Sequence, residues 1–481
     1  MGKEIKVVNT ERKEKDGTNR CPNCHASDVT YNIKKKKLIC NYCYTEFDAE
    51  DLEGIEKEAK NLKGETRTTG VKDINKNAND IITLKCSGCG AEVVINTNEA
   101  TNARCHWCRS ILSINHQVDN GAIPDVVLPF TLTKEEAQTK ISEFVEQRKF
   151  FANKQFKKEF TTKNIMGVYF PYMLVDANCH GKFIGEAEHK TRQYTVTVGS
   201  GDNRRHETRY DADLYSVERE FDISIDDLTI ESSLDKLNKN SKDKTTNVIN
   251  SIMPFDTENC VKYKGNYLEG FTSEKRDVNV SEIEDKVNLE LHDVARHALN
   301  KEMTFYDRGI KWIDQNIDIK GKQWVSAYLP VWLYSYQDKN KILHYVAVNA
   351  RTGETMGSVP IAMGKLFLLF GLIILAGIIL SAWLGSLSFI AGLICAFILL
   401  FSKLSKYRNK GARHTYEKET KNEITNLKEH DELLKHRTNL SNSRIIGANN
   451  TLILGENVKL KVQEEIQETA EKIKEEVENN K

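Results

Sequence analysis

Eight of the eleven cysteines form four C-x-x-C pairs, and their type and spacing indicate chemistry more clearly than any other residues do. Fifteen residues separate the first two pairs, and fifteen separate the last two. This repeated spacing predicts two four-cysteine sites, each holding one Zn2+ ion in a zinc ribbon. The predicted metal ligands are Cys21, Cys24, Cys40, Cys43, Cys86, Cys89, Cys105 and Cys108.

Both ions are expected to be structural. Because cysteine fills every coordination position, none remains for water or substrate. A ribbon is too small to fold on its own core, and zinc binding would supply about 10–16 kcal/mol. A redox dithiol and an iron–sulfur site remain alternatives for the same cysteines. Residues 30–40 and 91–105 are expected to form β-hairpins between the pairs, and His25 and His106 to cap the cysteine turns.

A basic stretch on the first predicted hairpin raises the question of nucleic-acid binding. The stretch consists of Lys34, Lys35, Lys36 and Lys37, and Tyr31, Tyr42 and Tyr44 are near it in the sequence. Such a patch could follow a phosphate backbone, but lysines also protect the edge of a hairpin. The whole chain has 69 basic and 69 acidic residues, so no global charge favours a polyanion. Docking of a protein is therefore the preferred role for the ribbons.

No enzyme class is specified by the sequence. It lacks the phosphate-binding loop, the dinucleotide-binding glycine motif, the H-E-x-x-H zinc motif and the G-x-S-x-G nucleophile motif. His292 and His297 are five positions apart on a predicted helix, so they point to different faces and are interpreted as structural. We therefore expect a protein that is not an enzyme.

An apolar segment, residues 361–402, predicts a membrane anchor. Lys365 is its only charged residue, and its length suits two spans better than one. The turn is expected at Gly385-Ser386, with arms over 366–384 and 387–402. Gly377, Ser381 and Gly385 would give the first arm a small-residue face for packing.

The charges around this hairpin predict its topology. The basic residues that follow it are Lys403, Lys406, Arg408, Lys410 and Arg413. By the positive-inside rule both ends lie in the cytoplasm, and the basic run would also contact anionic membrane lipid. The N-terminal residues contain no apolar run of the signal-peptide kind. We therefore expect a cell-membrane protein with two spans and with both termini cytoplasmic.

The remaining sequence predicts an α+β multidomain fold. Residues 123–360 contain two similar series, each with a capping box (133–136 and 281–284), an amphipathic helix, a Y-x-P-x-x-L strand (168–175 and 327–334) and an alternating segment (193–198 and 341–349). This repetition suggests a duplicated unit of antiparallel sheet with a packed helix. The proline in each strand favours an edge position or a bulge. The predicted segments are a charged tail (1–19), ribbon 1 (20–48), a charged helix and flexible linker (49–80), ribbon 2 (81–117), two α/β units (118–240 and 241–360), the hairpin (361–402), and a basic segment with a charged helical tail (403–481).

Two expectations concern how these segments behave. The linker at 49–80 has few large apolar residues, so the two ribbons are expected to be semi-independent. Residues 457–479 carry a thin apolar stripe, which predicts a charged helix.

The order of motifs also carries a resemblance to a known family. Its elements are the sequence Cys40-Asn41-Tyr42-Cys43-Tyr44-Thr45-Glu46-Phe47, the Leu128-Pro129-Phe130 and Met253-Pro254-Phe255 segments, Leu329-Pro330-Val331-Trp332 and the apolar hairpin. This order resembles bacterial membrane proteins that contain a transcription-factor-IIB-type zinc ribbon, over most of the chain. The resemblance implies a largely uncharacterised family with no established activity.

The preferred function is a membrane-anchored cytoplasmic scaffold or adaptor that recruits a protein partner. The alternative is a membrane-tethered nucleic-acid-binding protein that uses the four lysines of ribbon 1. Salt dependence distinguishes them, because phosphate contacts weaken steeply as ionic strength rises.

Overall fold

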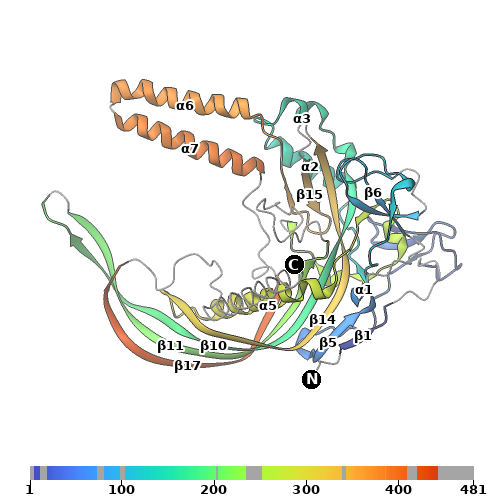
Figure 1. The fold of residues 1–481 in the computed structure, drawn as a ribbon, viewed down its shortest axis with the longest axis horizontal. Coiled ribbons are helices and arrows are strands. Elements are labelled where there is room, and N and C mark those ends of the chain that lie inside the picture. Colours follow the sequence, from blue (N-terminus) through green and yellow to red (C-terminus); the bar gives the residue numbers. More distant parts are fainter. Residues whose placement is uncertain are drawn as a thin grey trace, which may run out of the picture.

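The computed structural model describes residues 5–10, 19–72, 81–97, 103–201, 204–233, 252–337, 343–384, 386–408 and 420–441 of the 481. A body of short strands and helices carries two extensions on the same side (Figure 1). One is a curved arm of long strands, and the other is the helix pair α6 (Met363–Leu384) and α7 (Ser386–Arg408). The predicted α+β class is confirmed.

Two very long strands organise the large sheet. β10 (Met166–Val198) and β14 (Gly309–Gln337) pair in antiparallel fashion from Met166 opposite Leu333 to Glu188 opposite Gly309. The two predicted Y-x-P-x-x-L strands lie at the start of this ladder, where they pair with each other. The two predicted α/β units therefore share one continuous sheet.

The two prolines of these strands are not at an edge of the sheet, which corrects that expectation. Pro330 accepts a hydrogen bond from Ala350 N–H, and Pro171 accepts one from Ser232 N–H, both on the side away from the β10–β14 ladder. A residue in a strand directs its N and C=O to the same side, so neither proline would have donated to that ladder. On the side away from that ladder, Pro171 lies between the residues of β10 that pair with β13 and those that pair with β11. Pro330 likewise lies between the residues of β14 that pair with β9 and those that pair with β15. An interior position thus loses no hydrogen bond.

The arm is the four-stranded part of this sheet. Its order is β17 (Lys421–Leu440), β11 (Arg205–Glu231), β10 and β14, all antiparallel. Helix α5 (Val280–Glu302) packs on one face, and its predicted apolar positions, among them Ile283, Val287 and Leu291, are buried against the sheet. The capping box lies two residues before the predicted one, with Asn279 in place of Ser281 as the N-cap, and Asn279 N–H donates to Glu282 Oε2.

The chain before and after the hairpin contains strands where none was predicted. β1 (Ile5–Val8) pairs in parallel with β5 (Gly64–Thr68), and β5 pairs in parallel with β14. The predicted N-terminal tail and flexible linker are therefore wrong over these residues. The linker also contains a short helix, α1 (Thr69–Lys72). β17 likewise corrects the predicted helical tail over its length, whereas the helix expected at 457–479 lies outside the described residues.

Short elements complete the body. Helix α2 (Lys134–Glu146) has the predicted capping box, in which Thr133 N–H donates to Glu136 Oε2 and Glu136 N–H donates to Thr133 Oγ1. A second helix, α3 (Lys154–Glu159), follows. The remaining strands outside the ribbons are β9 (Val126–Val127), β12 (Val261–Lys262), β13 (Thr272–Glu274), β15 (Leu343–Asn349) and β16 (Thr355–Gly357).

The ribbons differ in how they join the body. Ribbon 1 has its own three-stranded sheet, with β2 (Val29–Asn32), β3 (Lys37–Cys40) and β4 (Glu46–Phe47), and β2–β3 is the predicted hairpin. In ribbon 2, β7 (Glu92–Asn96) pairs with β6 (Ile81–Lys85), so the hairpin encloses the first cysteine pair instead of joining the two pairs. β6 also pairs with β8 (Gln117–Val118), and β7 pairs with β13 of the body. Ribbon 2 is thus part of the large sheet, which corrects the expectation of semi-independent ribbons.

The helix pair is the predicted apolar hairpin. α6 ends at Leu384 and α7 begins at Ser386, where the turn was expected. Both helices are long and apolar enough to cross a membrane. At their contact, a Cβ added to Gly392 would lie 3.0 Å from Gly377 Cα, so the small residue predicted for packing does allow close approach.

Candidate metal centres

The first candidate centre brings together the four cysteines of ribbon 1. Their sulfur atoms all lie within 4.8 Å of one another. The Sγ atoms of Cys21 and Cys43 are 3.4 Å apart, and those of Cys24 and Cys40 are 3.5 Å apart. Four thiolates placed about 2.3 Å from a tetrahedral Zn2+ ion have sulfur atoms about 3.8 Å apart, so the observed spacing fits zinc.

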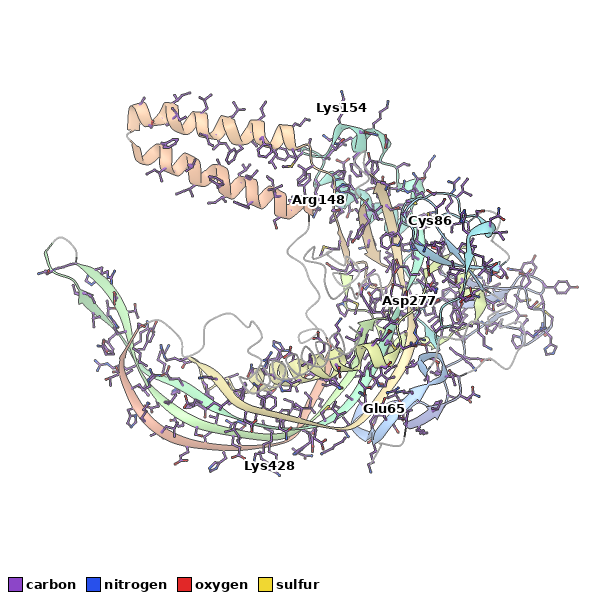
Figure 2. The ribbon with its side chains drawn as sticks, viewed as in Figure 1. Glu65, Cys86, Arg148, Lys154, Asp277 and Lys428 are labelled. Carbon is purple, nitrogen blue, oxygen red and sulfur yellow. The ribbon has the colours of Figure 1, made fainter. Side chains whose placement is uncertain are left out.

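The second candidate centre has the same geometry. Cys86 and Cys108 have Sγ atoms 3.4 Å apart, and Cys89 and Cys105 have them 3.6 Å apart. Again all four sulfur atoms lie within 4.8 Å of one another. Figure 2 shows Cys86 in the body of the molecule, far from the arm. The sequence therefore identified both sets of four cysteines correctly.

Each C-x-x-C pair closes the same backbone turn. The N–H of the residue after the second cysteine donates to the carbonyl of the first cysteine at 2.8–2.9 Å in all four turns. That residue has a positive φ each time, at His25, Tyr44, Gly90 and Arg109. His25 thus occupies a left-handed turn position beside the four cysteines. Side chains pay a steric cost in this region, which the closed metal site would offset.

Polar neighbours favour the thiolate form of two ligands. The Thr45 side chain, whose Oγ1 is 3.1 Å from Cys43 Sγ, and the Thr45 backbone lower the pKa of Cys43 to about 6. The sulfur contact with Cys105 lowers the pKa of Cys89 to about 5 and raises the pKa of Cys105. Thiolates are the form that binds metal. Metal binding at the second centre would therefore release a proton from Cys105.

The residues between the last two ligands anchor ribbon 2 in the body. His106 is buried, with Nδ1 3.1 Å from Thr272 Oγ1, and Trp107 Nε1 donates to Glu274 Oε1 at 2.7 Å. The Trp107 ring contacts Phe170 and Tyr345 edge to face. The expected capping role of His106 is therefore a docking role. No sequence signal separated this turn from the other three.

Ribbon 1 contacts residues 265–268 of the body. Asn266 Nδ2 donates to Val29 O at 2.6 Å, and the rings of Tyr31 and Tyr267 have centroids 5.4 Å apart. The outer turn of ribbon 1 is different, because Tyr42 and Tyr44 on either side of Cys43 are each 78% exposed. Ribbon 1 therefore presents two aromatic side chains to solvent beside its metal centre.

The four lysines of ribbon 1 do not act as four available charges. Lys34, Lys35 and Lys36 lie in the exposed turn between β2 and β3, and Lys37 begins β3. Lys35 forms an ion pair with Glu46, and Lys37 Nζ is 3.6 Å from Asp48. Two of the four candidates for nucleic-acid contact are thus paired with acids.

The basic residues predicted at the membrane surface are described in part. Lys403 is half-buried and Lys406 exposed on the last turns of α7, which ends at Arg408. Lys410 and Arg413 lie outside the described residues.

A third cluster, of three carboxylates, was not predicted. Asp176 of β10 lies at a register shift opposite Asp226 and Asp227 of β11, and the oxygen atoms lie within 4.8 Å of one another. Asp176 accepts hydrogen bonds from Asp227 N–H at 2.8 Å and from Gln323 Nε2 at 3.0 Å. Desolvation raises the pKa of Asp176 to about 8 and that of Asp227 to about 6.

This cluster gives a pH-dependent stability. Because the pKa of these carboxyls is higher in the folded protein than in the unfolded chain, the folded protein binds more protons between these pKa values. The free energy of unfolding therefore falls as pH rises from about 4 towards 8. Asp226→Asn removes one of the carboxylate charges that repel each other in this cluster. The melting temperature of this variant should therefore fall less between pH 5 and pH 8 than that of the wild type. Asp222→Asn is the matched control, because Lys320 holds the pKa of Asp222 well below its usual range. Equal pH dependence in wild type and Asp226→Asn would contradict the interpretation.

Comparison with known proteins adds little beyond this geometry. The chain is 23% identical over 242 residues to Uncharacterized protein YdjG of Bacillus subtilis (strain 168), a match that covers 50% of this chain and 65% of that protein. The chain thus spans slightly less than two thirds of this relative. No family model and no solved structure matches the chain.

Proposed function

We propose that the chain is a membrane-anchored adaptor in which zinc holds both ribbons and the exposed turn of ribbon 1 docks a protein partner. The observation that carries the proposal is the contrast between the two ribbons. Next to the last ligands of ribbon 2, His106 is buried and Trp107 and Arg109 are half-buried against the body, whereas Tyr42 and Tyr44 of ribbon 1 are exposed. Tyrosine supplies a large contact area at low entropic cost and is enriched at binding interfaces.

Membrane anchoring is supported by the exposure of the hairpin. Only 11% of the most apolar window of α6 and 6% of that of α7 are buried, although a core helix of a soluble protein would be largely buried. Large side chains such as Phe367, Leu368 and Ile398 are more than half exposed. Bilayer hydrocarbon would cover such a surface.

The ends of the hairpin support a topology with both flanks on one side. Ala362 N–H, before α6, donates to Phe151 O at 2.7 Å. Phe151 N–H donates to the hydroxyl of Tyr407, at the end of α7, at 2.9 Å. One body residue therefore contacts both ends of the hairpin. With the basic residues after α7, this arrangement supports a cytoplasmic body and two spans.

The role proposed is binding and not catalysis. Both metal centres are closed by four cysteines, which leaves no position for a substrate. The proposal includes a relationship to bacterial membrane proteins that contain a transcription-factor-IIB-type zinc ribbon, which the order of motifs in the sequence resembles. The alternative, nucleic-acid binding through Lys34 and its neighbours, is less favoured because Lys35 and Lys37 pair with acids.

Loss of the two exposed tyrosines should remove the partner. In pull-downs from detergent extracts, the combined change Tyr42→Ser and Tyr44→Asn is expected to reduce partner recovery at least about tenfold, the effect of about 1.4 kcal/mol in binding. Asparagine is chosen at position 44 because it tolerates the positive φ found there. Zinc content should stay at two ions per chain.

The matched control is Ile313→Ser, since Ile313 is 57% exposed on β14 and lies outside the ribbons. Its partner recovery should equal that of the wild type. A partner that is lost on nuclease treatment, or on changing Lys34, Lys35, Lys36 and Lys37 to Gln, would instead favour the nucleic-acid alternative.

A further inference from the structure

The turn between α2 and α3 is bound to the base of the hairpin. Besides the Phe151 contacts with Ala362 and Tyr407, Asn153 N–H donates to Pro360 O at 2.8 Å. Arg148 Nε donates to Lys406 O at 3.0 Å. The turn therefore lies where the hairpin leaves the body, at the level where bilayer headgroups would begin.

This turn is basic. Residues 147–158 contain Arg148, Lys149, Lys154, Lys157 and Lys158 and no acid, with Glu146 and Glu159 just outside. Lys149 bonds Glu146 at 2.6 Å, while burial, together with the charges of Lys365 and Lys149, lowers the pKa of Lys157. Cations from the turn and from the first helix of the hairpin thus gather in one place, where a negative surface would relieve their repulsion.

The same turn exposes an aromatic side chain. Phe150 is 75% exposed, its ring contacts Phe151 edge to face, and Lys157 Nζ is 3.4 Å from its carbonyl oxygen. An exposed phenylalanine among cations is a combination typical of surfaces that bind the interface of an anionic bilayer.

The arm does not offer a comparable surface. Its outer face carries alternating charges, among them Lys182, Asp222 and Lys428, which hydrocarbon would exclude. Figure 2 shows Arg148 and Lys154 near the end of the hairpin that joins the body, and Lys428 on the arm at the opposite side of the molecule. The base of the hairpin, and not the arm, is therefore the part of the body suited to meet lipid headgroups.

We propose that residues 148–158, which comprise the turn after α2 and most of α3, are a second membrane contact, in which the exposed Lys149, Lys154, Lys157 and Lys158 bind anionic phospholipid headgroups and Phe150 enters the interface. Arg148 is buried and donates to Lys406 O and Phe144 O, so it holds the turn to the hairpin instead. This inference rests on the proposed membrane anchoring. Each basic residue near an anionic membrane surface contributes about 1 kcal/mol to membrane binding, which is about a fivefold increase in affinity. The turn would thus orient the body on the membrane, which a flexible attachment to the hairpin alone would not do.

The test uses the full chain in vesicles, with trifluoromethyl-phenylalanine in place of Phe150. Its fluorine signal should broaden when spin-labelled lipid is added to vesicles that contain phosphatidylglycerol. The matched control carries the label in place of Phe305, which is 53% exposed and follows α5 on the arm; its signal should stay narrow. The double change Lys149→Gln and Lys157→Gln, or vesicles of phosphatidylcholine alone, should abolish most of the broadening at position 150.

Three results would overturn the proposal, and they are distinguishable. Protein that does not float with the vesicles would refute anchoring and this inference together. Protein that floats but shows equal narrow signals at positions 150 and 305 would refute only the second contact. Broadening at position 150 that is the same in both lipids and in the Gln variant would refute headgroup recognition.

Discussion

Replacing Cys105 with serine is expected to destabilise the whole body, whereas Cys40→Ser should remove one metal ion and leave the large sheet folded. The reason is the different attachment of the two ribbons. Ribbon 2 shares β7 with the body, because β7 pairs with β13 and β13 pairs with β10. A structural zinc site contributes about 10–16 kcal/mol in isolated ribbons, comparable to the about 5–15 kcal/mol that hold a whole domain.

Ribbon 1 is attached without shared strands. Its sheet of β2, β3 and β4 is separate, and its described contacts with the body include those of Asn266 and Tyr267. Loss of its metal should therefore unfold ribbon 1 and lower the main melting transition only slightly.

Metal analysis and thermal unfolding of the full chain check both expectations. We expect two zinc ions per chain in the wild type and about one in Cys40→Ser, with the main transition retained. Cys105→Ser should lose its ion and melt well below both. Cys395→Ser is the control, since this exposed cysteine lies on α7 and outside both clusters. Iron in place of zinc, or equal melting of the two ligand variants, would contradict the assignment.

The two clusters of four cysteines could be predicted because their information is local. Four thiolates need only two short turns and a fixed separation, and both are visible in the sequence. The docking of ribbon 2 could not be predicted in this way. It depends on Trp107 meeting Phe170 and Glu274, residues that are distant in the chain and carry no spacing signal.

The long strands show a second limit. The prediction contained a strand at 168–175 and a separate alternating segment at 193–198, yet both belong to β10. Burial also alternates along the residues between these two segments, where Cys179, Phe183 and Ala187 are buried and their neighbours are less so. The alternation typical of a strand was therefore present in the sequence. Strands of this length are far from the usual five or six residues, which made two short strands the natural interpretation.

β17 was missed for a different reason. Its sequence is rich in Lys, Glu, Asp and His, which resembles an exposed tail or helix. In the structure it pairs with β11 at the edge of the arm, where charged side chains such as Lys428 and Asp431 pair with residues of β11. Charge on an edge strand prevents pairing with other chains, so this composition suits the position. Periodicity alone does not reveal an edge strand whose two faces are both polar.

Excising the hairpin should turn the chain from an integral membrane protein into one that is extracted without detergent. Because Phe151 contacts Ala362 and Tyr407 at the base of the hairpin, a short Gly-Ser linker in place of residues 367–405 can close the gap while these contacts are retained. The expected result is release into the alkaline carbonate supernatant, with two zinc ions per chain retained. The apolar surface of α6 and α7 is then absent, and the remaining basic turn gives only weak, salt-sensitive membrane binding.

A single charge gives a graded version of the same test. Leu375→Arg places a cation near the middle of α6, at a cost of about 2.5–3.5 kcal/mol for insertion of that helix, so partial release is expected. Phe305→Arg, an exposed position beyond α5, is the matched control and should change nothing. Reporters fused after Ser113 and after Asn479 should both remain cytoplasmic in the wild type, because two spans return the chain to its starting side. Export of the C-terminal reporter would mean a single span, and full carbonate extraction of the wild type would mean that the hairpin covers a protein surface instead of crossing a bilayer.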